Sequence, residues 1–168
     1  MGDRLKNQPL LTITFKRVGS GFTGLIPIGS FLSAEGDLHK KLQTASKAYG
    51  DALVEMRESL VAIQAFGKRR AHAPARLVWR LGNGVFALRQ RLAQLSFEVD
   101  GLYDHLCRDL AMNRKWLEKV VILRRYVPRE SLLPTSLTWG QIDKGTRRKL
   151  QAMGFLHQQS GRLPIEMA

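Results

Sequence analysis

The sequence predicts a mainly α-helical protein: a bundle built on two long amphipathic helices, with a short N-terminal β-hairpin and a small C-terminal helix plus turn. Apolar residues recur at steps of three and four along most of residues 38–110, which is the helical period. They alternate at every second position only near the N-terminus, as in a strand. We therefore expect an N-terminal strand or hairpin extension over 1–33 and a helical bundle over 34–130. A C-terminal part over 131–168, with one helix and a segment that could form a hairpin, should pack on the bundle.

The N-terminal strand rests on the alternation of Leu11, Ile13 and Phe15 with polar residues. A glycine-rich turn follows over 19–24, and residues 25–28 could return as a second strand. The Gly-x-Gly-x-x-Gly string in this turn resembles a phosphate-binding loop, but Pro27 argues against the helix that such a loop requires. Because a two-stranded hairpin is marginal alone, we expect it to lean on the helices or to join the sheet of another subunit.

The first long helix is expected to begin after Ser33, a suitable N-cap, and to end near Gly67. Its apolar stripe consists of Leu38, Leu42, Ala45, Tyr49, Ala52, Met56, Leu60 and Ile63. The second long helix is expected to begin at Pro74 and to continue to Leu110, because the same spacing persists throughout. The glycines at 82 and 84 mark the place where it could bend.

Two shorter helices complete the prediction. The first covers Asn113 to Tyr126 and stops before Pro128. The second begins at Thr138, which forms a capping-box sequence with Gln141, and runs to Met153, where Gly154 closes it.

Composition excludes several classes of protein. The chain has 168 residues, 44% of them hydrophobic, so one sizeable core is expected. The single cysteine, Cys107, permits no internal disulfide, and no apolar stretch approaches the roughly 20 residues that a membrane-spanning helix needs. We expect a cytoplasmic protein without a membrane span.

Catalytic and metal-binding patterns are weak. The four histidines are scattered, with no spacing typical of a zinc site, so we expect neither metal nor other cofactor. Asp100 and Asp104 share a helix face beside His105, as a metal-dependent nuclease would require, but ion pairing with neighbouring bases such as Arg108 explains them more simply. We expect that the protein is not an enzyme.

The distribution of charge is the most informative feature. Lys and Arg number 27 against 14 Asp and Glu, giving a formal net charge of +13, and no acidic residue lies between Glu58 and Glu98. Such an excess favours an anionic partner. Three basic clusters occur, at 68–91, at 119–129 and at 144–149. The residues that we expect to contact nucleic acid are Lys68, Arg69, Arg70, Arg76, Arg80, Arg89, Arg91, Arg124, Arg125, Lys144, Arg147, Arg148 and Lys149.

One helix face in the first cluster suggests how such contact would work. Arg76, Arg80 and Arg91 share this face with Gly84 and Ala87, whose small side chains would let a polymer backbone approach between the arginines. Guanidinium groups match phosphate geometry, and few aromatic residues interleave the bases. Contact is therefore expected to be mostly with RNA or DNA backbone, with little dependence on base sequence.

Two resemblances bear on function. The string from Gly145 to Leu156, followed by Ser160-Gly161-Arg162, resembles the recognition helix and wing of winged-helix DNA-binding domains. In size, helicity and basic charge, the whole chain is similar to the helical small subunits of CRISPR effector complexes. That resemblance implies a subunit that supports nucleic acid through phosphate contacts within a multi-subunit assembly.

The predicted function is therefore a non-catalytic nucleic-acid-binding subunit of a larger nucleoprotein complex. Partner subunits could be reached through the strand that contains Leu11, Ile13 and Phe15. The alternatives are a winged-helix-like DNA-binding regulator, and a basic module for an acidic protein partner or a membrane surface.

Overall fold

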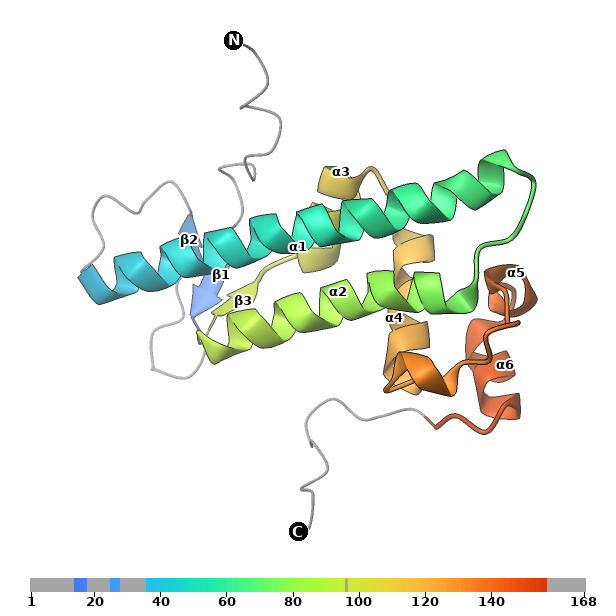
Figure 1. Ribbon diagram of the computed structural model, residues 1–168. Helices are drawn as coiled ribbons and strands as arrows, with labels where there is room; N and C mark the ends of the chain where they lie inside the picture. The colour runs from blue at the N-terminus through green and yellow to red at the C-terminus, as the bar shows by residue number, and fades with distance from the viewer. Residues whose placement is uncertain (1–13, 18–24, 28–35, 96, 157–168) are drawn as a thin grey trace.

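The computed structural model describes residues 14–17, 25–27, 36–95 and 97–156, and its architecture is mainly helical (Figure 1). Two long helices, α1 (Gly36–Lys68) and α2 (Ala75–Gln94), lie side by side and run in opposite directions. Helix α3 (Leu102–Leu110) packs on α1, and α4 (Arg114–Tyr126) crosses α2. The turn η2 (Glu130–Leu132) and two short helices, α5 (Trp139–Ile142) and α6 (Thr146–Ala152), follow.

The core lies where α1, α2 and α4 meet. Most of the stripe predicted on α1 is buried, from Leu42 through Tyr49 and Met56 to Leu60. The predicted first helix is thus confirmed from Gly36 to its end near Gly67, whereas the expected N-cap, Ser33, lies outside the described residues. Residues from the C-terminal part, including Leu133 and Leu150, belong to the same core.

Two glycines let the neighbouring helices approach α2 closely. A Cβ at Gly82 would lie 2.7 Å from the carbonyl oxygen of Val120 in α4, and one at Gly84 would lie 2.8 Å from Cγ of Met56 in α1. Helix α2 continues through both positions, so the glycines do not divide it. Their missing side chains instead leave room for α4 and α1 to pack closely on α2. This packing explains why glycines, which lower the stability of a helix, occur at these two positions.

The prediction of one helix from 74 to 110 is wrong, because α2 ends at Gln94 and a short strand precedes α3. In this strand, β3 (Phe97–Val99), Phe97 and Val99 are both buried, at 3% and 5% exposure. Gly101 then adopts a φ of +63°, which a residue within a right-handed helix does not have. The three-four spacing persists here because Val99, a strand residue, lies four positions after Leu95 and three before Leu102.

Strand β3 belongs to a small antiparallel sheet with the order β2-β1-β3. In it, β1 (Thr14–Arg17) pairs with β2 (Leu25–Pro27) and with β3, so that Phe15 lies opposite Ile26 on one side and Val99 on the other. Strand β1 therefore has neighbours from its own chain on both sides. Leu11, Ile13 and the connecting turn lie outside the described residues, and the N-terminal hairpin as a whole stays a prediction.

The helix predicted from 113 to 126 is confirmed. The side chain of Asn113 caps it by accepting hydrogen bonds from the backbone N–H of Lys115 and Trp116, at 2.9 and 3.3 Å. The last predicted helix begins as expected, since Gln141 Oε1 accepts from the Thr138 N–H at 2.9 Å to form the capping box.

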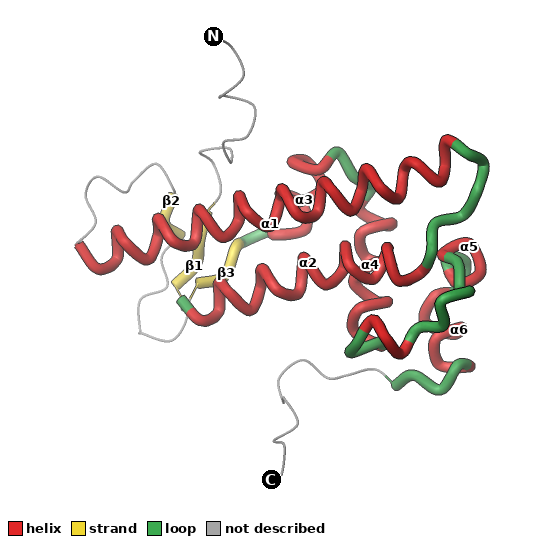
Figure 2. The backbone as a smooth tube through the Cα atoms, in the orientation of Figure 1, coloured by secondary structure: helices red, strands yellow, loops and turns green. Residues whose placement is uncertain are grey.

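That last helix is divided, however, into α5 and α6. The division falls at Gly145, whose φ of +78° places it in the left-handed region and reverses the chain direction. Gly154, with a φ of +91°, follows the end of α6 at Ala152, in agreement with the prediction. The expected C-terminal hairpin lies mostly beyond residue 156, outside the described part. Figure 2 shows these helices and their connections. No helix among the described residues is long and apolar enough to cross a membrane.

The close packing at Gly82 can be tested by adding one methyl group. We expect Gly82→Ala to lower the free energy of unfolding by about 1–3 kcal/mol, because the new methyl group meets backbone, which cannot rotate away. The matched control is Gly67→Ala, in a helix with no atom within 4 Å of the added Cβ, where a gain of about 0.5–1 kcal/mol is expected. Denaturant unfolding measures both, and equal stability of the two variants would contradict this packing.

Candidate nucleic-acid interface

Two of the predicted basic clusters lie at the same end of the bundle. The connector between α1 and α2 is joined to the start of α5, because the Trp139 N–H donates to the Ala73 carbonyl at 2.8 Å and the Ala75 N–H donates to the Leu137 carbonyl at 2.9 Å. The ring of His72 lies against Gly140, where a Cβ would come within 2.6 Å of Nδ1. The connector and α5 are therefore held side by side, as Figure 1 also shows.

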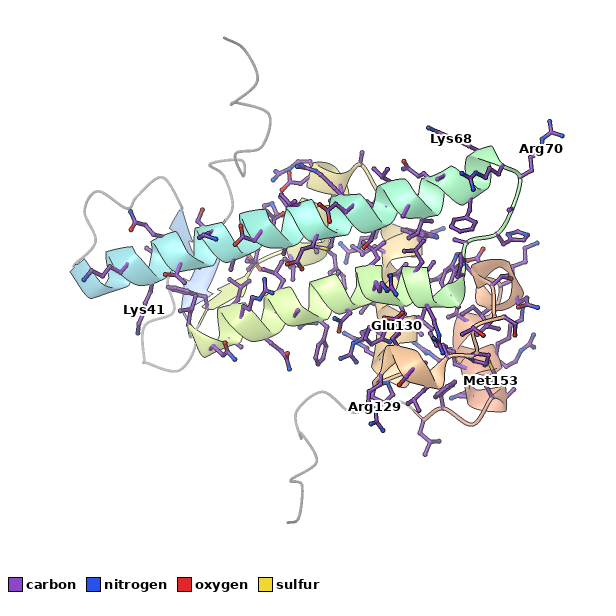
Figure 3. All side chains as sticks on the ribbon, in the orientation of Figure 1. Lys41, Lys68, Arg70, Arg129, Glu130 and Met153 are labelled. Atoms are coloured by element: carbon purple, nitrogen blue, oxygen red, sulfur yellow. The ribbon has the colours of Figure 1, made fainter. Side chains whose placement is uncertain are left out.

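We call the exposed cations at the end of α1, in the connector, and in the turn and helix α6 that follow α5 the basic end. Its members are Lys68, Arg69, Arg70, Lys144, Arg147 and Arg148. Figure 3 shows the side chains of Lys68 and Arg70 reaching outward from the connector, at the opposite end of α1 from Lys41.

Contacts with the core and with α5 hold in place helix α6, which carries Arg147 and Arg148. Leu150 is fully buried, and the Lys149 ammonium donates to the Gln141 carbonyl at 2.7 Å, which ties α6 to α5. The Thr146 hydroxyl donates to the Asp143 carbonyl at 3.0 Å at the start of the helix. The exposed arginines are thus presented on a supported helix, so less of their freedom is lost when a ligand binds.

Within residues 59–95 and 127–156 of the described chain, no acidic residue without a partner is left to neutralise the basic end. The sequence has no acid between Glu58 and Glu98, and only Glu130 and Asp143 within 127–156. Both are already paired: Glu130 with Arg80 at 2.8 Å, and Asp143 with Lys119 at 2.7 Å. The exposed cations therefore create a positive potential that attracts anions.

Two arginines of the face predicted on α2, Arg76 and Arg80, have hydrogen-bond partners within the protein. Arg76 donates from Nε to the Leu133 carbonyl at 2.8 Å, and Arg80 donates from Nε and Nη2 to the Glu130 carboxylate at 2.8–3.1 Å. That carboxylate also raises the pKa of Arg80 by hydrogen bonding to its charged form. Both arginines therefore join α2 to the η2 segment.

The proposed role of the small residues between these arginines is not supported either. Gly84 faces Met56 of α1, so its missing side chain admits a helix and not a polymer backbone. At the far end of the face, Arg91 pairs with Glu55 at 3.9 Å, a long contact between exposed side chains that contributes little.

Arg124 is a packing residue. Its guanidinium lies over the rings of Phe86 and Trp79, with Cζ at 4.1 and 5.1 Å from their centroids, and Nε donates to Asn83 at 2.9 Å. Burial lowers the pKa of Arg124, because the charged form loses solvation. The structure thus assigns it to the contact between α2 and α4.

The remaining predicted contacts, Arg89 and Arg125, lie elsewhere. Both line a cavity near the C-terminal end of α2, together with residues of β3 and α3. The structure therefore divides the predicted set into a basic end, a group with partners inside the protein, and this separate pair.

The acidic residues considered for nuclease chemistry are engaged in other contacts. Asp104 pairs with Arg114, which also holds Glu118 at 3.1 Å, and His105 Nδ1 lies 3.1 Å from Nη2 of Arg108. Asp104 thus pairs with an arginine other than the expected Arg108. Within the described ranges, no group of three or more His, Cys, Asp or Glu side chains is placed to hold a metal ion.

Other exposed cations were not among the predicted contacts. Among them are Lys40, Lys41, Lys115 and Arg129, whereas the exposed Lys47, Arg108 and Arg114 form ion pairs. Arg129 follows the 119–125 bases directly, and its position in that cluster was the available signal. The lysines at 40 and 41 lie far from the basic end, at the other end of α1, and serve as natural controls.

Comparison with protein-family models, with curated proteins and with solved structures finds no match to this chain.

The structural role of Arg76 predicts a loss of stability when its donors are removed. We expect Arg76→Met to lower the free energy of unfolding by about 1–2 kcal/mol, because the carbonyl of the fully buried Leu133 loses a charged donor. Arg69→Met, at an exposed position, should change stability by less than about 0.5 kcal/mol. Thermal and denaturant unfolding test both; similar losses would show that the hydrogen bond contributes nothing.

Arg70 offers a test that separates binding from stability. It lies two residues after the end of α1 with a φ of +54°, a left-handed position that favours glycine, and the Ala71 N–H donates to the Phe66 carbonyl at 3.0 Å. We expect Arg70→Gly to raise the free energy of unfolding by about 0.5–1 kcal/mol while weakening nucleic-acid binding. Unfolding and binding are measured on the same sample. A variant that is less stable than the wild type would contradict the backbone argument, and unchanged affinity would remove Arg70 from the interface.

Proposed function

We propose that the protein is a non-catalytic subunit that binds the phosphate backbone of nucleic acid at the basic end, within a larger nucleoprotein complex. The observation that carries the proposal is the combination of exposed lysines and arginines on two joined segments with the pairing of both nearby acids, Glu130 and Asp143. Cations without counter-charges repel one another, and a polyanion relieves that repulsion.

The chemistry of these side chains favours phosphate over bases. Arginine forks bind two phosphate oxygens at once, and lysines add point charges. The tryptophan nearest the basic end, Trp139, is 8% exposed and packs edge-on against Trp116, so its ring face is not offered to a base. Affinity should therefore depend strongly on salt and weakly on base sequence.

A role within an assembly agrees with the net charge of +13, which opposes self-association and favours anionic partners. It is also the role implied by the resemblance to the small helical subunits of CRISPR effector complexes. The winged-helix alternative places the same helix, α6, in a major groove and therefore requires sequence preference.

The proposal predicts a charge-specific loss of binding. Arg147→Gln/Arg148→Gln should weaken binding to labelled duplexes and single strands about equally for unrelated sequences, with the dependence of log K on log salt flattened by about 1–2 for duplexes. The matched control, Lys40→Gln/Lys41→Gln, removes the same net charge from the other end of α1 and should leave most of the affinity. Fluorescence anisotropy across a salt series measures both.

The outcomes of this experiment divide the hypotheses. Equal losses in the two double variants would show that net charge, and not the basic end, sets binding. Strong preference for one duplex sequence would favour the DNA-binding regulator. Absence of binding to every nucleic acid, together with co-flotation with anionic liposomes or capture of an acidic protein, would replace the proposal by a membrane-surface or protein-interaction role.

A further inference from the structure

A cavity of about 690 Å³ lies away from the basic end, where α2 ends and β3 and α3 begin. Its size is within the range of small-molecule sites. Helix α2 has 20 residues, which at 1.5 Å per residue separates its two ends by about 30 Å. The connector that carries Arg70 precedes α2, and the cavity adjoins its last turns, so the two features lie at opposite ends of the helix (Figure 1).

One part of the cavity wall is apolar. Leu92 comes from the last turns of α2, Phe97 and Val99 from β3, and Leu102 from the start of α3. The aromatic ring of Tyr103 adds to this wall, and its buried hydroxyl has no hydrogen-bond partner. Such a wall accommodates a flat or aliphatic body, while the unused hydroxyl leaves one polar group available after a small adjustment.

Charged side chains make up most of the remaining lining: three arginines and the carboxylates of Asp100 and Asp104. Asp104 pairs with Arg114, and Asp100 has an interaction of its own. Arg89 comes from α2 and Arg125 from α4, and neither has an ion pair or hydrogen bond within the described part of the chain. The third lining arginine, Arg114, differs because Asp104 and Glu118 already hold it. Two guanidinium groups are therefore left to meet a ligand, one from each of two packed helices.

We propose that this cavity binds a small phosphate monoester with an apolar, aromatic body. A phosphate group has several acceptor oxygens, so Arg89 and Arg125 can each donate to it, and a planar ring fits against the wall formed by β3 and the start of α3. The site is separate from the proposed backbone interface, and a phosphate held there belongs to a small molecule and not to a bound strand.

The probe for the test is 1-naphthyl phosphate, with titration calorimetry as the measurement on the full chain. It should bind with a dissociation constant at least about tenfold lower than those of 1-naphthol, which lacks the charge, and of inorganic phosphate, which lacks the ring. Arg89→Gln/Arg125→Gln should weaken binding by about tenfold or more. The single variant Arg89→Gln, at an exposed position, provides the same test with less risk to folding.

The controls separate this site from the basic end. Lys40→Gln/Lys41→Gln and Arg147→Gln/Arg148→Gln should both retain the affinity for 1-naphthyl phosphate. No detectable binding by the wild type, equal binding of inorganic phosphate, or unchanged affinity in folded Arg89→Gln/Arg125→Gln would each overturn the proposal. Because nucleic-acid binding is measured separately on the same proteins, failure of one proposal leaves the other standing.

Discussion

The close approach of α1 and α4 to the two sides of α2 is the constraint on which the rest of the structure depends. It exists because Gly82 and Gly84 have no side chains where Val120 and Met56 lie. The close packing of α2 and α4 places the Arg124 guanidinium over the Phe86 ring. It also lets the Trp79 indole Nε1 donate a hydrogen bond of 2.7 Å to the Val127 carbonyl. The position of α4 in turn determines where the C-terminal segment can pack, because α6 rests on α4. Two residues with low helix propensity thus organise a helical protein.

The same packing decides what the arginines do. Side chains of one type, close together in sequence, have different environments because their partners come from distant segments. Arg80 finds Glu130 fifty positions away, and Arg76 finds the Leu133 carbonyl at a separation of 57. An arginine that is hydrogen-bonded within the protein stabilises the fold and is less available to a ligand. An arginine without a partner adds to the positive electrostatic potential of the surface. The excess of positive charge is therefore more localised in space than in sequence.

The sequence predicts local structure well and partners poorly. The stripe on α1, the helix from 113 to 126 and the capping box at Thr138 depend on neighbouring residues, and each was predicted correctly. The interruption at β3 was missed because Leu95, Val99 and Leu102 keep the helical spacing although Val99 lies in a strand, which pairing with β1 stabilises. Partners from distant segments also determine the contacts of Arg76 and Arg80 on α2. The spacing of apolar residues cannot predict that Glu130 and the Leu133 carbonyl are the partners of these arginines. It also cannot predict the cavity that Arg89 and Arg125 line together.

The two backbone hydrogen bonds between residues 73–75 and 137–139 have a consequence for the order of folding. Helices α1 and α2 form a hairpin of consecutive elements, whose contacts close early because the intervening chain is short. The contacts of Ala73 and Ala75 with residues 137–139 form only after the intervening chain, which includes α3 and α4, has closed into a loop. Closing this longer loop costs more conformational entropy than closing the connector between α1 and α2. A chain emerging from the ribosome therefore builds its hairpin first and completes its most positively charged surface last. Charge repulsion then acts mainly on a scaffold that is already packed.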